Sequence, residues 1–144
     1  MAALTLLPLS SVLPPAQADS VTPRVLKPNA CDGKTKGHIV KWYVPHVPFD
    51  KVPLRCGTET GFGFNKIRKK HWSPTVDEDI ANTLARPTTS YDQDRNTRVF
   101  LLKDLAPCRG QYRVVVSYLN YGSTGIKGII TAYHEDLAGA GARC

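Results

Sequence analysis

Hydrophobic positions in the middle of the chain recur every three or four residues, which is the period of an α-helix. Phe64, Ile67 and His71 would share one face of a short helix, whose basic stretch covers 66–71. Ser73-Pro74 ends this helix, because the residue before a proline is pushed out of the helical region. A second helix begins after Thr75 and ends before Pro87. Its buried stripe consists of Val76, Ile80, Ala81 and Leu84.

Beyond a polar loop over 88–96 the period changes to that of strands. Three runs rich in β-branched and aromatic residues, 97–102, 112–119 and 127–133, predict strands joined by short loops. Connections this short favour antiparallel pairing. Helices followed by a meander predict an α+β domain, in which two N-terminal helices pack on a C-terminal antiparallel sheet stabilised by two disulfides.

The segment before the helices reads as a proline-rich lead-in over 19–56. Residues 38–44 are a candidate short strand, whereas Pro45, Pro48 and Pro53 predict a loop over 45–60. The main α+β domain is expected over 57–144.

The N-terminus has the pattern of a signal peptide. Residues 1–18 carry no Asp, Glu, Lys or Arg, and Ala16-Gln17-Ala18 fits a cleavage site, so the mature chain would begin at Asp19. This predicts a secreted or exported protein; the alternative is an unstructured apolar tail. No apolar run reaches the roughly 18–20 residues of a membrane span, which argues against an integral membrane protein.

Four cysteines support export. An even number in an exported chain predicts two disulfides, and four cysteines allow three pairings. We expect Cys31–Cys56 and Cys108–Cys144, each closing a local segment; the alternative is four free thiols in a reducing compartment. The absence of a CxxC pair argues against a zinc site. We expect no metal and no cofactor.

The net charge of +7 favours polyanionic partners such as RNA. The helix over 66–71 concentrates this charge in Lys66, Arg68, Lys69 and Lys70, which could contact phosphates. His71 suits proton transfer near neutral pH. Cleavage of RNA by its own 2′-hydroxyl needs such groups and no metal. The alternative is a solvated basic face with His71 packed beside it.

The last strand adds candidate substrate-binding groups. Strand alternation places Lys127, Ile129, Thr131 and Tyr133 on one face, and the other face carries Gly128, Ile130, Ala132 and His134. Thr131 and Tyr133 could donate hydrogen bonds to a phosphate, with Lys127 adding charge; alternatively they are ordinary strand and core residues. The second acid/base group is open among His38, His46 and His134.

The order of these features resembles the barnase/EndoU/colicin D/RelE-like (BECR) ribonuclease toxins. Its pieces are Gly61-Phe62-Gly63, the helix ending in His71, a second helix, a polar loop and three strands, the last ending in Thr131-Ala132-Tyr133. The resemblance implies metal-independent cleavage of RNA, frequently tRNA, and a cognate immunity protein. It makes His71 the acid/base residue and Thr131 and Tyr133 the substrate-positioning pair. Lys66 stands where many members carry a second histidine.

These observations together predict a secreted basic endoribonuclease or toxin that cleaves RNA by 2′-hydroxyl transesterification. The alternative is a secreted, non-enzymatic domain that binds acidic polymers or cell surfaces. A third reading is an inhibitor or adhesion module with a rigid surface.

Overall fold

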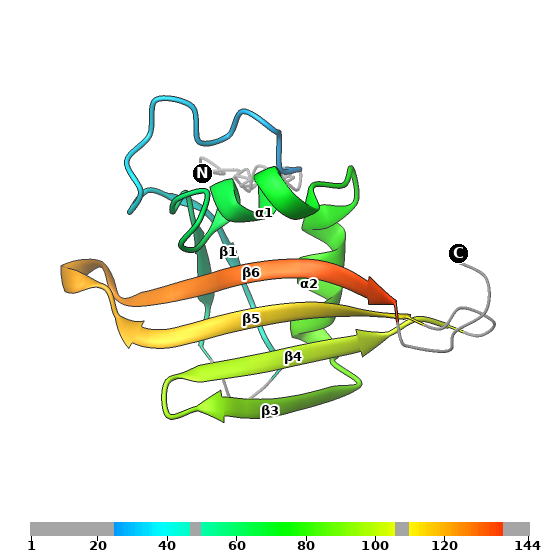
Figure 1. The fold of residues 1–144 in the computed structure, drawn as a ribbon. Helices are drawn as coiled ribbons and strands as arrows, with labels where there is room; N and C mark the ends of the chain where they lie inside the picture. The colour runs from blue at the N-terminus through cyan, green and yellow to red at the C-terminus, as the bar shows by residue number, and fades with distance from the viewer. Residues whose placement is uncertain (1–24, 47–49, 106–109, 137–144) are drawn as a thin grey trace, which may run out of the picture.

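The computed structural model describes residues 25–46, 50–105 and 110–136 (Figure 1). It confirms helices combined with antiparallel sheets. The elements follow in the order β1 (Ile39–Tyr43), β2 (Val52–Arg55), α1 (Phe64–His71), α2 (Val76–Ala85), β3 (Thr89–Asp94), β4 (Thr97–Lys103), β5 (Gly110–Asn120), a 3₁₀ turn (Gly122–Thr124) and β6 (Ile126–Asp136).

The main sheet has the order β3-β4-β5-β6, with every neighbouring pair antiparallel, and β1 pairs with β2 in a separate two-stranded sheet. In Figure 1, α2 passes behind the main sheet and α1 lies along the β6 edge. The face of the sheet opposite α2 is called the open face below. The core lies between the helices and the sheets and includes Phe64, Ile67, Ile80, Phe100 and Val114.

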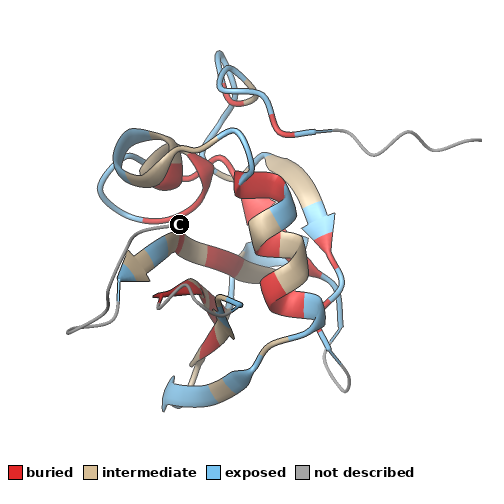
Figure 2. Cartoon of the chain, turned by 90° about the vertical axis from the view of Figure 1, so that its right-hand side faces the viewer, coloured by how far each residue is buried: buried red, intermediate tan, exposed pale blue. Residues whose placement is uncertain are grey.

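Two segments expected as loops form strands instead. Residues 52–55 of the predicted 45–60 loop are β2, and residues 89–94 of the predicted 88–96 loop are β3. Pro53 is tolerated because a two-stranded sheet leaves each strand with an unpaired edge. Strand β3 is polar because it is the sheet's edge strand and lies largely in solvent, as the pale blue strand at the bottom of Figure 2 shows.

Strand β6 contains a bulge that changes which residues share a face. Thr131 pairs with Val115 and Ile129 with Val116, so Ile130 is an extra residue between them. Ile129 and Ala132 are therefore both in the core. The expectation that Ile129 would lie on the face of Thr131 was wrong. The Ile130 carbonyl accepts a hydrogen bond from the Gly63 N–H at the start of α1, at 3.1 Å.

The lead-in belongs to the same core as the helices. Tyr43, Val52 and Leu54 pack in it, and the Cys31–Cys56 disulfide, predicted from the sequence, joins the irregular segment before β1 to the end of β2. The proposed partners Cys108 and Cys144, and the 1–18 segment, lie outside the described residues. None of the helices described here has the length and apolar character needed to cross a membrane.

Candidate active site

His71 is the last residue of α1 and lies against β6. Its ring stacks on that of Tyr133, with centroids 4.8 Å apart and an angle of 28° between the planes. Partial burial lowers the pKa of His71, and the positive charges of Lys70 and Lys66 lower it further. Arg68, another cation of α1, does not contribute to this shift. Arg68 instead donates hydrogen bonds to the Pro28 carbonyl at 3.0 Å and to Asp32 at 3.2 Å.

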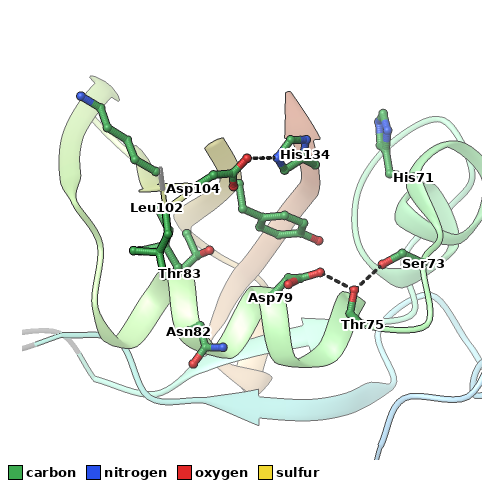
Figure 3. A pocket seen from close by; sticks show the side chains of 12 residues that line it. His71, Ser73, Thr75, Asp79, Asn82, Thr83, Leu102, Asp104 and His134 are labelled. Carbon is green, nitrogen blue, oxygen red and sulfur yellow. Dashed lines mark hydrogen bonds and ion pairs between the residues drawn. The ribbon is translucent and has the colours of Figure 1, made fainter. Parts of the chain in front are cut away.

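The neighbour of Tyr133 on β6, His134, pairs with a carboxylate. Its Nε2 lies 2.7 Å from Oδ2 of Asp104, a residue that follows β4. His134 and His71 line one cavity of about 430 Å³ between α2 and the end of the sheet. Figure 3 shows the two histidines at the top of this cavity, with Asp79 and Thr83 of α2 below them. The cavity thus brings together two imidazoles and two carboxylates, those of Asp104 and Asp79.

The other two histidines considered for acid/base chemistry lie elsewhere. His38 precedes β1 and lines a separate hollow with Leu26 and Val40. The His46 backbone N–H donates to the Leu84 carbonyl at the end of α2, and its side chain does not line the cavity of His71. Of the three alternatives, His134 is the one that shares a cavity with His71.

Thr131 and Tyr133 lie on the open face. They pair with Val115 and Arg113 of β5, which alternate with the core residues Val114 and Val116 and so point away from the core. The Thr131 hydroxyl is buried and has no hydrogen-bond partner among the described residues. A buried hydroxyl without a partner is costly, and such groups are often found where a ligand or water binds. The Thr131 hydroxyl thus lies unpaired in the described part of the chain, and Tyr133 contacts His71.

An ionic network that the sequence did not predict lies on the same face. Arg113 donates to Glu135 at 2.9 and 3.2 Å and to the Tyr91 hydroxyl at 3.0 Å, and Gln111 also donates to Glu135. Burial acts to raise the pKa of Glu135, but the hydrogen bonds from Arg113 and Gln111 outweigh it, so the pKa is lowered. The hydrogen bond to Glu135 raises the pKa of Arg113. The network places a fixed carboxylate two residues beyond Tyr133.

The predicted phosphate-binding side chains separate into two groups. Lys66 and Lys70 are near enough to His71 to lower its pKa. Lys69, in contrast, forms an ion pair with Glu59. Lys127 lies over the Phe62 ring, 4.7 Å from its centroid, near the start of β6. Six residues of strand, roughly 20 Å, separate it from Tyr133, so the structure does not bring Lys127 to His71.

Weak signals in the sequence pointed to the missed residues. Arg113 interrupts an apolar strand run, and Glu135 continues the two-residue period of Thr131 and Tyr133. Asp104 carried no such signal, since it lies 30 positions from His134. Within the described ranges, no cluster of three or more His, Cys, Asp or Glu side chains could hold a metal ion.

Comparison with protein-family models, with curated proteins and with solved structures finds no match to this chain. Its function is therefore inferred from the side chains of the site.

Proposed function

We propose that the protein is a basic, metal-independent endoribonuclease that cleaves RNA by transesterification. The observation that carries the proposal is the cavity that both His71 and the His134–Asp104 pair line. Two imidazoles at one site can supply both proton transfers of this reaction, one as base and one as acid. The net charge of +7 and the basic last turn of α1 support an anionic substrate.

His71 is the general base in this mechanism. Its lowered pKa keeps it neutral near pH 7, so that it can accept the proton of a ribose 2′-hydroxyl. The 2′-oxygen then forms a bond to the adjacent phosphorus as the bond from phosphorus to the 5′-oxygen breaks. The products are a 2′,3′-cyclic phosphate and a free 5′-hydroxyl.

His134 is the general acid that protonates the leaving 5′-oxygen. Its Nε2 lies 2.7 Å from Oδ2 of Asp104, whereas its Nδ1 lies 3.8 Å from Oδ1 of Asp136, beyond hydrogen-bond distance, so Nδ1 is the atom that transfers the proton. The Asp104 carboxylate fixes the ring and can pair with the imidazolium form that this role requires, as a carboxylate does for the histidine of a hydrolase triad. If water later hydrolyses the cyclic phosphate, the two histidines exchange roles, with His134 as the base and His71 as the acid.

Tyr133 is a positioning residue in this scheme, because it holds the His71 ring by stacking. Lys66 and Lys70 attract the phosphate through their charge. The unpartnered Thr131 hydroxyl would bind substrate that reaches the open face. Export, preference for tRNA and a cognate immunity protein remain predictions from the sequence.

The test is cleavage of total RNA by the purified, oxidised protein in EDTA. We expect His71→Ala and His134→Ala each to lower the rate by about 10²–10⁴-fold, the usual contribution of a general acid or base. His38→Ala is the matched control, since His38 lies in a separate hollow, and it should cleave at the wild-type rate. A folded His71→Ala variant with the wild-type rate would overturn the mechanism. A wild-type protein that binds RNA without cleaving it would favour the non-enzymatic binding domain.

A further inference from the structure

Trp42 is an exposed aromatic side chain on the outer face of β1. Its neighbours in the strand point inward, since the Lys41 ammonium and the Tyr43 hydroxyl both donate to the Asp77 carboxylate of α2, at 2.7 and 2.8 Å. Because side chains alternate along a strand, Trp42 faces away from α2, and 48% of it is exposed. The other tryptophan, Trp72, packs against the core. Trp42 therefore offers an indole face to a ligand.

Two hollows, of about 460 and 370 Å³, share Trp42, Asp50 and Lys51 among their lining residues. We call them together the Trp42 hollow. Its second part continues to Tyr118, near the end of β5, and to the backbone at the start of β6. At Gly125 nothing lies within 4 Å of the place that a Cβ would take, so this end is open. Pockets of this volume, with an aromatic wall and a few polar groups, are typical of small-ligand sites.

Asp50 and Lys51 are the charged groups of the Trp42 hollow. Both are exposed, and neither makes a hydrogen bond or an ion pair with another described residue. The carboxylate accepts hydrogen bonds and the ammonium donates them, so both remain available to a ligand. Their opposite charges cancel, although the whole protein carries +7. The hollow thus combines an aromatic face with one acceptor and one donor, without the surplus positive charge that a phosphate would need.

We propose that the Trp42 hollow binds an oligosaccharide of glucopyranose units. A pyranose with equatorial hydroxyls presents axial C–H groups of partial positive charge on its flat faces, and the face of an indole carries partial negative charge. Stacking would cover the exposed indole, while hydroxyls at the edge of the sugar donate to Asp50 and accept from Lys51. RNA fits less well, because its phosphodiester would lie beside the Asp50 carboxylate with one lysine to offset it.

The Trp42 hollow is separate from the cavity of His71 and His134. The two share no lining residue among those that the structure describes. The hollow reaches β6 at its first residue, Ile126, and eight positions along the strand, roughly 25 Å, separate Ile126 from His134. The inference is therefore independent of the proposed function. A protein held on a polysaccharide through Trp42 would keep its histidine cavity open to RNA.

The experiment is titration of the wild-type protein with cellopentaose and, separately, with pentauridylate, followed by tryptophan fluorescence and calorimetry. Trp72 does not line the hollow, so a change in tryptophan emission on binding there reports on Trp42. We expect cellopentaose to shift the emission to shorter wavelength in a saturable way. Trp42→Ala should weaken binding at least tenfold, and Trp42→Phe, which keeps an aromatic face, should weaken it less. Asp50→Ala should also weaken it at least tenfold, the effect of losing a hydrogen bond to a charged group.

Val44→Ala is the matched control, since Val44 is also exposed but does not line the hollow, and it should bind cellopentaose as the wild type does. Asp50→Ala decides the question if Trp42→Ala does not fold. No saturable change with cellopentaose, or undiminished binding by these folded variants, would overturn the sugar site whether or not RNA is cleaved. A response to pentauridylate alone would assign the hollow to RNA bases and overturn it too. Binding of cellopentaose by a protein that cleaves no RNA would support the site and reject the proposed function.

Discussion

The Cys31–Cys56 disulfide should be one of the largest single contributions to the stability of this domain. It closes a loop with a sequence separation of 25 residues. Loop-closure entropy for about 25 residues predicts a loss of about 3.5 kcal/mol at 25 °C when the bond is reduced. Domains of ordinary size have about 5–15 kcal/mol of stability in total, so the loss is a large fraction of the whole.

The assay compares urea unfolding of oxidised and reduced protein in a Cys108→Ala/Cys144→Ala background, where Cys31–Cys56 is the only bond that a reductant can break. Because Cys56 is fully buried, reduction is better than substitution, which would also remove packing. A difference below about 1 kcal/mol would refute the reasoning. The same background, compared with the wild type, tests the predicted Cys108–Cys144 pairing by intact mass after alkylation.

Four further predictions concern the site and its scaffold. Arg55→Ala should cost about 3–5 kcal/mol by chemical denaturation, because the fully buried guanidinium donates to three carbonyl oxygens that would lose their partner. Asp77→Ala should also destabilise the protein, by about 3 kcal/mol, since it removes the carboxylate that accepts hydrogen bonds from the Lys41 ammonium and from the buried Tyr43 hydroxyl; a melting temperature equal to that of the wild type would contradict this. The lowered pKa of His71 means that cleavage should persist below pH 6.5, its ordinary value, and that the stability due to its neutral form is lost as pH falls through that region; a pH–rate profile that falls at or above 6.5 argues against His71 as base. Lys70→Gln should reduce the log–log salt slope of RNA binding by about one unit, and more than Lys69→Gln, whose ammonium is paired with Glu59; equal slopes would place Lys70 away from phosphate.

The helices could be predicted from the sequence because their signals are local. The spacing of Phe64, Ile67 and His71 and the stripe from Val76 to Leu84 both reflect burial against one core, and Pro74 and Pro87 mark where the helices stop. Strands β2 and β3 could not be predicted in the same way. Pro53 in β2 is a signal against a strand. The polar side chains of β3 face solvent rather than a core, so they leave no hydrophobic pattern in the sequence.

The site could be predicted only in part, because some of its contacts depend on tertiary structure. His71 and Tyr133 stood out by residue type, and the structure brings them into contact. The partners of His134 and Arg113 depend on tertiary pairing: Asp104 lies 30 residues away and Tyr91 lies 22 residues away. Strand alternation also failed at Ile130, because a bulge adds one residue to one strand without a mark in the sequence.

The bulge in β6 has a mechanical consequence for the two histidines. Its hydrogen bond to Gly63 anchors the beginning of α1 on β6. The helix that carries His71 and the strand that carries His134 are therefore joined at this point. Position 63 leaves no room for a side chain. A Cβ on Gly63, whose φ is +83°, would come within 2.4 Å of the Arg55 carbonyl oxygen. The spacing of the two imidazoles is thereby set within one corner of the molecule. Strand β3 forms the opposite edge of the main sheet and reaches this corner through the Tyr91 hydroxyl, which accepts a hydrogen bond from Arg113. Insertions in the turn between β3 and β4 should therefore be tolerated where a single substitution at Gly63 is not.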